Sequence, residues 1–573
     1  MVIIQGYTLP DLFTMLDHFL RLFCKLRTII LISLLLILTA CEQQQKLPPR
    51  ELDHPLILIG LDGAEWGVIK PMIANGELPN LKKLMDAGVH GGLINPGAMI
   101  SPPVWTTFIT GEHPRIHGVL DHVFPFDDTS SKQPVNSTLR VKPALWNIAS
   151  EAGLRTAALG YFVSWPAEDI HGTVVTDRAM QKYTDSVFPP SSVRSVNKIV
   201  EELIDDDAHE EFLRRYYAWG YRPEQANNPD DEHYKAARLI IGRADRLFVN
   251  DEIIRRTAID LQTDAYDFVS VYLRSTDLAS HSFWREFDDS GFDKPADPEL
   301  KHQLGDVIPE TYRFVDETIG DLIDKFGSEA NFIIISDHGF ESAKKEIILS
   351  SQHQSVLTGN HLPVGVFIAS GPDIQGQSDM PADWQVTVVD IFPTLARLLQ
   401  LPIAKSLPGA PLDSIFMPEF LAAQPVLEVA GYPVDGFARK YNSAVAVNQT
   451  KEMDSLSGLG YIGGSTTEGS SEQKIYNFWM AKDRLLIEHT SGEIVSALLN
   501  DKYQHAEKTL LRFLKHKPEL EKVLLRAVRK RLHLLAESEY MNRALDGQKV
   551  FQKFRRKFNR THPGVWAEGA EKA

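Results

Sequence analysis

The stretch "NFIIISDHGF", residues 331–340, is the part of the sequence that decides the fold class. Its apolar run Phe332–Ile335 has no polar and apolar alternation, which indicates a strand covered on both faces. Gly339 marks a turn directly after the run. We therefore expect Asp337 and His338 at the carboxyl end of a central strand, where open α/β sheets bind their ligands. For this stretch alone, a charged loop residue beside a solvated histidine is an equally good interpretation.

Other apolar runs of the same kind recur along the chain and alternate with helix-like segments. This order predicts an α/β fold with a mainly parallel central sheet covered by helices on both faces. The apolar runs are 56–61, 156–161, 268–273 and 364–369, and the clearest helical segments are 78–88 and 317–327.

The composition of the 573 residues is that of a folded protein, with 43% hydrophobic and 24% charged residues. The net charge of -16 is unevenly spread. Residues 501–573 hold 18 Lys and Arg against 9 Asp and Glu, so this end is basic and the remainder is strongly acidic. An acidic body argues against nucleic acid as a partner. The basic end suits either an anionic membrane surface or, as the more common case, a solvated helical face.

Several motif residues follow predicted strands. Asp62 comes directly after the run 56–61, and Asp277 and His281 follow the run 268–273 at a spacing that places them on one helix face. His361 lies just before the run 364–369. Burying three carboxylates together without compensation is costly. A divalent cation compensates such a cluster, and Asp and His ligands without thiolates suit zinc or a similar metal.

Ser101 begins the segment "SPPVWTTFITG" (101–111). Because Pro102 follows it, we expect Ser101 to be the N-cap of a helix that has proline at its first position. The hydroxyl would then lie at the positive end of the helix dipole, beside free backbone N–H groups that suit a phosphate. A metal ion on this hydroxyl would make it an alkoxide nucleophile. A plain helix cap is the alternative.

Taken together, these motifs resemble the type I phosphodiesterase/nucleotide pyrophosphatase group of the alkaline phosphatase superfamily. The resemblance runs from about residue 55 to 415 and rests on several short motifs in the same order: DG (62–63), LPNL (78–81), SPPVWTTFITG (101–111), HPRIHGV (113–119), DLASH (277–281), SDHG (336–339) and NH (360–361).

The resemblance implies a hydrolase of phosphate esters with two divalent metal ions, expected to be zinc, and a phospho-serine intermediate. Asp277, His281 and His361 would hold one zinc. The other would be held by Asp62, Asp337, His338 and the catalytic Ser101.

Two features depart from the family pattern. Members often have a phosphate-contacting asparagine shortly after the HG motif, where this chain has His122. His122 is therefore a candidate substrate-binding residue. Arg274, three residues before Asp277, is a second candidate, with a surface ion pair as the alternative. Sulfatases need an arginine where this chain has Trp105, which argues against a sulfatase.

Two other functions remain open. The first alternative is a phosphotransferase, which passes the phosphoryl group to an envelope lipid or glycan rather than to water. It could also be a binding or scaffold lipoprotein with a decayed catalytic core, although the complete set of seven site residues weighs against decay.

The N-terminus predicts the location. Lys25 and Arg27 precede the apolar run Thr28–Ala40, which is too short to span a bilayer comfortably and ends directly before Cys41. The sequence Leu-Thr-Ala-Cys resembles the lipobox of bacterial lipoproteins, which implies cleavage before Cys41 and lipidation of its thiol. We expect a lipid-anchored protein of the bacterial cell envelope, facing the periplasm or the exterior. An uncleaved anchor helix is the alternative.

The C-terminal helical region contains "NDKYQHAEKTLLRFLKHKP" (500–518), which resembles the second half of a tetratricopeptide repeat through Tyr503, Ala506, Phe513 and Pro518. A generic helical bundle fits equally well, and either form offers a surface for a protein partner. The expected domains are a signal peptide (1–40), a tether (41–54), an alkaline-phosphatase-like catalytic domain (55–440) with a helical insertion at about 185–256, a linker (441–475) and the helical region (476–573).

Overall fold

The computed structural model describes residues 52–124, 133–183, 185–204, 215, 228–231, 247–261, 266–350, 355–376, 386–432, 486–500, 502–537 and 547–562. The chain divides into two compact units, Met1–Pro49 and Arg50–Ala573, and the described residues all belong to the second unit. The predicted signal peptide, Cys41 and the predicted linker lie outside the described residues. Within the described part, no helix is both long enough and apolar enough to cross a membrane.

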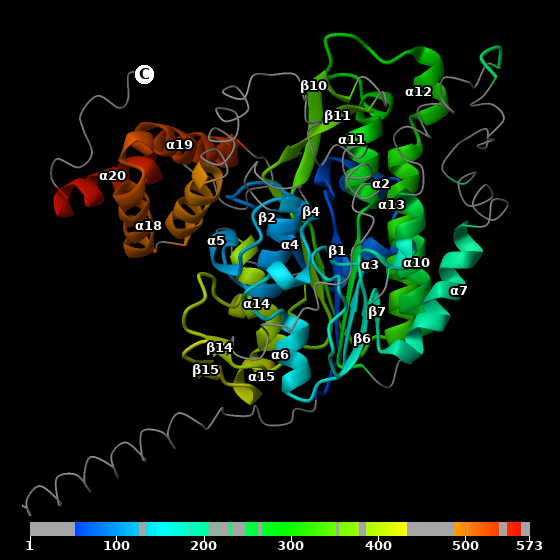
Figure 1. The fold of residues 1–573 in the computed structure, drawn as a ribbon, viewed down its shortest axis with the longest axis horizontal. Helices are drawn as coiled ribbons and strands as arrows, with labels where there is room; N and C mark the ends of the chain where they lie inside the picture. Colours follow the sequence, from blue (N-terminus) through cyan, green and yellow to red (C-terminus); the bar gives the residue numbers. More distant parts are fainter. Residues whose placement is uncertain are drawn as a thin grey trace, which may run out of the picture. The chain divides into compact units, whose positions relative to one another are not determined.

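A nine-stranded sheet forms the centre of this unit, with the strand order β13-β2-β12-β9-β1-β8-β5-β6-β7 (Figure 1). The five consecutive strands β9-β1-β8-β5-β6 are parallel to one another, whereas β12 is antiparallel to both of its neighbours and β7 is antiparallel to β6. The predicted mainly parallel sheet is therefore confirmed. The strands are β1 Leu56–Leu61, β2 Val89–Ile94, β5 Thr156–Leu159, β6 Gly172–Val175, β7 Val187–Phe188, β8 Phe268–Leu273, β9 Asn331–Ile335, β12 Val364–Ser370 and β13 Val386–Thr387.

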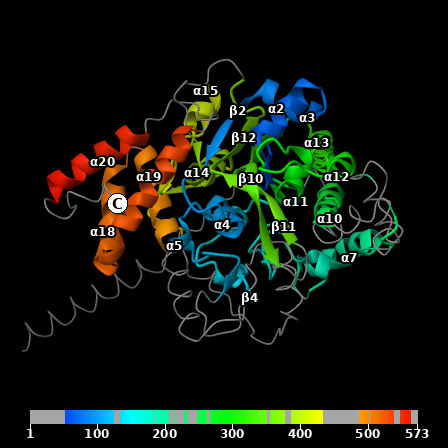
Figure 2. The same ribbon diagram turned by 90° about the horizontal axis from the view of Figure 1, so that it is seen from above.

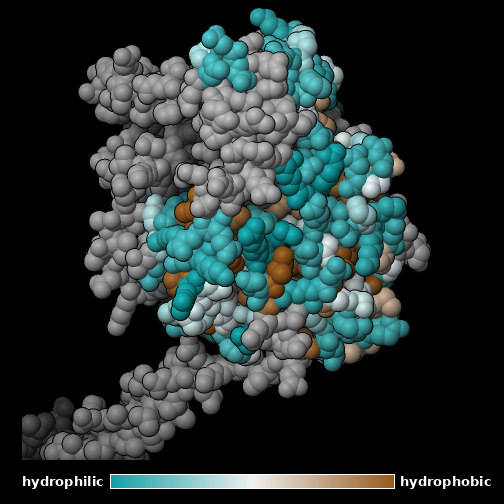
Figure 3. Space-filling model, turned by 90° about the vertical axis from the view of Figure 1, so that its right-hand side faces the viewer, coloured by the Kyte–Doolittle hydropathy of each residue, from teal (hydrophilic) through white to brown (hydrophobic). Residues whose placement is uncertain are grey.

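Helices cover both faces of the sheet, as predicted (Figures 1 and 2). In β1, Ile57, Ile59 and Leu61 face a large apolar cluster shared with one helical layer. Gly60 faces the other layer, where an added Cβ would lie 2.4 Å from the ring of Trp105. The first layer contains α2 Trp66–Ala74, α3 Pro79–Ala87, α7 Val193–Ile204, α10 Leu247–Asp260, α11 Ser275–Phe287, α12 Pro298–Leu304 and α13 Val307–Phe326, and the second contains α4 Ser101–Thr110, α6 Leu145–Glu151 and α14 Val388–Leu398. Seen from the side of α7, α12 and α13, the described surface is mostly hydrophilic, with apolar side chains scattered over it (Figure 3).

A β-hairpin connects the end of β9 with β12. Strand β10, Gly339–Ser350, begins directly after His338 and pairs antiparallel with β11, Ser355–Leu362, so that Phe340 lies opposite His361. The hairpin thus returns His361 to the end of β9. The remaining short elements are α5 Pro114–His117, α15 Pro418–Ala423 and the pairs β3 Val123–Phe124 with β4 Gln133–Pro134 and β14 Ile403–Ala404 with β15 Glu428–Val429.

The C-terminal region is helical in its described parts. A helix over 486–499 is followed by α18 Tyr503–His516, α19 Glu521–Glu537 and α20 Gly547–Thr561. Their apolar residues form one cluster that also includes Ile94 and Val364 of the central sheet. Ala506 and Phe513 are buried, and Pro518 begins a single 3₁₀ turn between α18 and α19. A tetratricopeptide-like repeat stays a prediction, and most of the predicted insertion at 185–256 lies outside the described residues.

Candidate active site

Three aspartates meet at one edge of the sheet because three neighbouring parallel strands end there. Asp62 directly follows β1, Asp337 follows β9 after one intervening residue, and Asp277 lies in the first turn of α11, after β8. Strand β1 pairs with β8 on one side and β9 on the other. All three carboxylates are fully buried. The convergence expected from the sequence is therefore present in the structure.

Asp277 forms the first group of ligand atoms with two histidines. Its Oδ1 lies 3.3 Å from His281 Nε2 and 3.4 Å from His361 Nε2, and the two Nε2 atoms are 2.7 Å apart. The Nδ1 atom of His281 faces the carbonyl of Gly359 at 3.3 Å, and that of His361 faces the carbonyl of Met99 at 3.0 Å. Backbone carbonyls that hold Nδ1 in this way leave Nε2 directed into the site, which is a common arrangement of metal-binding histidines.

The second group lies around His338. Its Nε2 is 3.5 Å from Asp62 Oδ1 and 3.4 Å from Asp337 Oδ2, and its Nδ1 is 3.2 Å from the carbonyl of Gly339. The Ser101 hydroxyl donates a hydrogen bond to Asp62 Oδ1 at 3.3 Å. The structure thus brings together all seven residues that the motifs singled out.

His338 also joins the two groups. Its ring stacks on the ring of His361 with the centroids 3.6 Å apart, and its Nε2 lies 3.7 Å from Asp277 Oδ1. Two sets of three have ligand atoms within 4.8 Å of one another: Asp277 with His338 and His361, and Asp62 with Asp337 and His338. His338 therefore lies between the sets, whereas the family resemblance placed it in the second set alone.

The electrostatics of the cluster fit divalent cations. Burial and the charge of Asp277 raise the pKa of Asp62 to about 7, and burial together with Asp62 raises the pKa of Asp337 well above its usual value. Burial would also raise the pKa of Asp277, but His281 and His361 outweigh it and hold that pKa well below its usual range. Within the described part of the chain, Asp337 Oδ2 and His338 Nε2 have no hydrogen-bond partner. Buried carboxylate and imidazole atoms left in this state are what bound cations would satisfy.

Several supporting residues were not predicted from the sequence. The Tyr272 hydroxyl donates to Asp62 Oδ2, and the Thr276 hydroxyl donates to the Asp62 carbonyl. The Ser336 hydroxyl accepts a hydrogen bond from Ala64 N at 2.8 Å. Tyr272 was detectable in principle, because it is a polar-tipped residue next to the end of an otherwise apolar strand, just before the motif that holds Asp277.

The start of α4 differs from the prediction by one residue. Ile100 occupies the N-cap position and Ser101 is the first helical residue, fully buried at the end of the helix that faces Asp62. Pro102 and Pro103 then follow, and neither has a backbone N–H. The first turn therefore offers fewer N–H donors than expected from the sequence, and the N–H of Ser101 is the only one among these three residues. A phosphate bound here needs further positive partners.

The hydroxyls nearest to Ser101 along the helix are already engaged. Thr106 Oγ1 donates to the carbonyl of Pro102 at 2.7 Å, and Thr107 Oγ1 donates to the carbonyl of Pro103 at 3.0 Å. Neither hydroxyl is therefore directed at the carboxylate cluster in the way that Ser101 is.

The two candidate substrate-binding residues both lie near the aromatic ring of Phe162. His122 is buried and meets Phe162 edge to face, with the ring centroids 6.1 Å apart, and the Arg274 guanidinium lies 5.3 Å from the centroid of Phe162. Burial lowers the pKa of His122 to about 3, so its ring is neutral at pH 7. The backbone N–H of Arg274 donates to Asp251 Oδ2 at 2.8 Å. Phe162, which no sequence motif indicated, connects the two.

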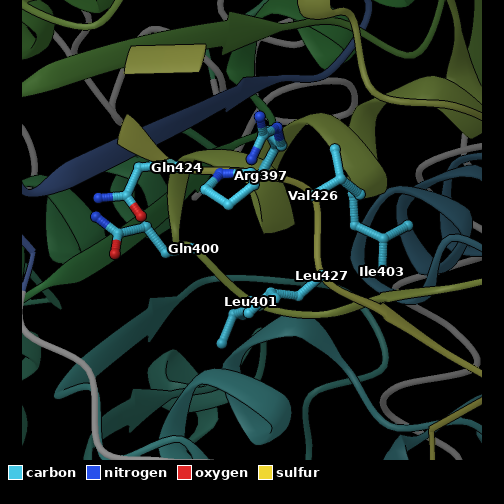
Figure 4. Close-up of a pocket in the computed structure, with 8 residues that line it drawn as sticks. Arg397, Gln400, Leu401, Ile403, Gln424, Val426 and Leu427 are labelled. Carbon is cyan, nitrogen blue, oxygen red and sulfur yellow. The ribbon is translucent and has the colours of Figure 1, made fainter. Parts of the chain in front are cut away.

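Two small hollows lie apart from these residues. One, lined by Arg397 of α14, by residues of the following segment 400–403 and by the segment 424–427, has a volume of about 10 Å³, enough for about one water molecule (Figure 4). The other, of about 30 Å³, lies between the segment 95–98, α14 and the helix over 486–499. Both are too small for an organic substrate, so the carboxylate cluster remains the candidate site.

The comparison with known families agrees with this geometry. Residues 56–379, more than half of the chain, match the family described as Type I phosphodiesterase / nucleotide pyrophosphatase. The chain belongs to this family. All seven clustered residues, from Asp62 to His361, lie inside the matched segment. The family consists of phosphate-ester hydrolases of the alkaline phosphatase superfamily, which is the enzyme class that the motifs predict.

Curated relatives match over a shorter stretch. Ectonucleotide pyrophosphatase/phosphodiesterase family member 7 of Rattus norvegicus is 27% identical over 135 residues, and that of Mus musculus is 26% identical over 141 residues. These matches cover 22% and 23% of this chain and 30% of each relative's length.

Solved structures of ectonucleotide pyrophosphatase/phosphodiesterase 5 are also similar. The murine protein, in an inactive form in complex with AMP, is 15% identical with a TM-score of 0.36 and covers 64% of this chain and 100% of its own. The human protein is 13% identical with a TM-score of 0.37 and covers 63% of this chain and 99% of its own.

Proposed function

We propose that this chain is a metal-dependent hydrolase of phosphate esters, of the phosphodiesterase type, that acts through a phospho-serine at Ser101. The observation that carries the proposal is the meeting of three buried aspartates from adjacent strand ends with three histidines, with the Ser101 hydroxyl hydrogen-bonded to one of the aspartates. Burial of this many ionisable groups in one place is expensive unless the site binds cations. The donor set, oxygen and imidazole without thiolate, favours two zinc ions.

Each ion would have its own set of ligands. Asp277, His281 and His361 would hold one ion, and Asp62, Asp337 and Ser101 the other, with His338 between them. When bound, the ions would stabilise negative charge on the phosphate oxygens and favour the ionised form of the serine hydroxyl.

Ser101 would attack phosphorus from the end of α4. A bond forms between its Oγ and phosphorus while the bond to the leaving oxygen breaks in line. The proton of the hydroxyl leaves toward the Asp62 carboxylate, which already accepts its hydrogen bond. The leaving oxygen departs as an alcohol and takes up one proton, so that this step is balanced overall. A water oxygen then bonds to the phosphorus of the phospho-serine while the bond from phosphorus to Oγ breaks. The phosphate monoester leaves, and a proton of the water restores the serine hydroxyl.

Substrate recognition would use the wall of His122, Phe162 and Arg274. With two prolines following Ser101, the helix start supplies little of the positive environment that a phosphate needs. The Arg274 guanidinium is a planar donor suited to phosphate oxygens. The neutral His122 ring offers a hydrogen-bond donor where relatives often use an amide.

The test is turnover of an aryl phosphate diester by the metal-loaded protein. Ser101→Ala should lower turnover on the order of 10⁶-fold, because removing a nucleophile that acts as part of a unit has about this effect. Ser101→Thr should keep part of the activity, since it retains a hydroxyl at the same place. Metal content should remain close to two ions per chain in both variants, because the other ligands are unchanged.

Thr107→Ser is the matched control on the same helix and should keep turnover within a few-fold of wild type. Retention of a tenth or more of the activity by Ser101→Ala would show that Ser101 only begins the helix, and the proposed mechanism would then be abandoned.

We also propose that Cys41 is lipidated and holds the protein at a membrane of the bacterial envelope. The support is the lipobox-like sequence after a short apolar run. Cys41→Ser should abolish uptake of labelled fatty acid, while Cys24→Ser, the control at the only other cysteine, should not. A wild-type protein that takes up no label would refute this proposal without affecting the proposed chemistry.

A further inference from the structure

Where the structure describes the side chains of helices α18, α19 and α20, the exposed charged ones are basic. Among residues 502–518, 521–536 and 547–562, every exposed acidic or basic side chain is Lys, Arg or His. The acidic residues Glu507 and Glu521 are mostly buried, and Glu507 accepts a hydrogen bond from the Thr561 hydroxyl at 2.7 Å. The exposed cations are Lys508, Arg512 and Lys515 on α18, Lys522, Arg526, Arg529 and Lys530 on α19, and Lys549, Lys553, Arg556, Lys557 and Arg560 on α20.

This surface is unusual for a solvated helical face. Solvated helices normally mix both signs of charge, because pairs of opposite charge three or four residues apart stabilise the helix. Here the like charges repel one another along each helix. The remainder of the chain carries the opposite sign, since residues 501–573 have a net charge of +9 in a chain of net charge -16.

Large apolar side chains stand among the cations of α19. Val523 is 48% exposed and Leu534 is 42% exposed. The spacing of Val523, Lys530 and Leu534, at seven and four residues, puts them on one face of the helix. Apolar and basic side chains on one exposed face are typical of helices that lie in the interface of a membrane.

We propose that the basic surface of α18, α19 and α20 binds the headgroups of anionic phospholipids at a bilayer surface. Lysine and arginine near such a surface each contribute favourably through the negative surface potential, and the apolar residues insert at the boundary of headgroups and acyl chains. The binding would be a second, reversible contact with the membrane, independent of the proposed lipid on Cys41.

Membrane fits the observations better than nucleic acid does. A nucleic acid would be repelled by the acidic body of the same chain. Val523 and Leu534 would also not contribute to its binding, because contacts with a phosphate backbone are made by cations and hydrogen-bond donors. The apolar residues are therefore the feature that separates the two classes of partner.

The experiment uses a chain that begins at Glu42, which has no lipid and contains the whole compact unit Arg50–Ala573. Sedimentation with vesicles of phosphatidylcholine containing one third phosphatidylglycerol should carry the protein down at low salt, and vesicles of phosphatidylcholine alone should not. Lys522→Glu/Arg529→Glu/Lys530→Glu should weaken binding on the order of 100-fold or more, because each cation near the surface contributes several-fold. Val523→Ser/Leu534→Ser should weaken it about 10-fold without any change in charge.

The matched control is Lys83→Glu/Lys198→Glu/Lys405→Glu, which reverses three exposed cations outside the C-terminal helices and should bind as wild type does. Turnover and far-ultraviolet circular dichroism of each variant would show that it is folded. Equal binding by the control and the α19 triple variant, or no binding by wild type, would overturn the proposal. Tighter binding to a single-stranded oligonucleotide than to the vesicles, unaffected by Val523→Ser/Leu534→Ser, would assign the surface to nucleic acid instead.

Discussion

Two buried clusters of ionisable residues in this protein differ in how far neighbouring side chains balance the charge of their carboxylates. At the sheet edge, Asp62, Asp277 and Asp337 lie together, and the ion-pair contacts of Asp62 and Asp337 are with His338. Where the C-terminal helices meet α5, a single carboxylate, Glu493, has several partners: Arg115 Nη2 at 2.9 Å, His505 Nε2 at 3.2 Å and the Thr509 hydroxyl at 2.6 Å.

The pKa values of two of the three aspartates show the same division, whereas the pKa of Asp277 is, against the effect of burial, held low by His281 and His361. Burial and neighbouring carboxylates raise the pKa of Asp62 and Asp337. Burial would also raise the pKa of Glu493, but His505, Arg115 and Thr509 outweigh it and hold that pKa well below its usual range. A cluster whose charges are balanced by the protein holds two parts of the chain together. A cluster whose charges are left unbalanced is suited to bind cations, and this difference separates a structural site from a functional one.

The largest expected effect comes from removing one carboxylate of the unbalanced cluster. Asp337→Asn should lower the metal content of the purified protein from two ions per chain to about one, because zinc is bound by carboxylates, imidazoles and thiolates and a neutral amide is a poor substitute. In the metal-free protein the same substitution should not destabilise the fold, since it relieves repulsion among three close carboxylates. Elemental analysis and urea unfolding with and without chelator measure the two results.

The matched control is a buried aspartate that the protein satisfies by itself. Asp316 Oδ1 accepts a hydrogen bond from Leu81 N at 2.7 Å, and Asp316 Oδ2 accepts one from Asn80 N at 3.2 Å. Asp316→Asn should keep both ions and lose about 1–3 kcal/mol of stability, because one buried N–H loses its charged acceptor. If Asp337→Asn kept full metal content and lost stability as Asp316→Asn does, the two kinds of cluster would not differ as argued.

The fold of the sheet was predictable because its signals are local. Apolar runs such as Ile333–Ile335 show that both faces of the strand are covered, and the alternation with helices predicts parallel order. The predicted α/β architecture is confirmed. The antiparallel insertion of β12 between β2 and β9 was not predictable, because it depends on pairing across more than 200 residues between β2 and β12 and leaves no mark in either strand.

The candidate site was predictable to a similar depth. Strand-end positions identified Asp62, Asp277 and Asp337, and the family resemblance added the grouping with histidines. The position of His338 between the two groups, and the proximity of the Phe162 ring to both His122 and Arg274, required side-chain geometry. The start of α4 was missed by one residue because Ile100, which has no capping side chain, occupies the N-cap position, where serine would normally be preferred.

A smaller effect is expected on the pH dependence of stability, through His489 at the interface with the C-terminal helices. His489 is 6% exposed, its Nε2 faces the carbonyl of Leu120 at 3.0 Å, and burial lowers its pKa to about 4. Glu488 acts to raise this pKa, whereas Arg531 and Arg115 act to lower it. In the unfolded chain a histidine has a pKa of about 6.5.

Between pH 6.5 and pH 4, therefore, the unfolded chain binds a proton at His489 that the folded chain does not. The stability contributed by the neutral ring is present above pH 6.5 and is lost as the pH falls toward 4, by about 1.4 kcal/mol per pH unit at most. Replacing His489 by Gln keeps a donor for the Leu120 carbonyl and removes the group that binds this proton. Between pH 6.5 and pH 5, the free energy of unfolding should therefore fall less in the variant than in wild type, by about 2 kcal/mol. Urea unfolding at the two pH values measures this difference, and His302→Gln, at an exposed position, should behave as wild type does. A His489→Gln variant with the full wild-type loss would show that the ring is already protonated at the interface, and the balanced cluster would then contain one more positive charge than its partners indicate.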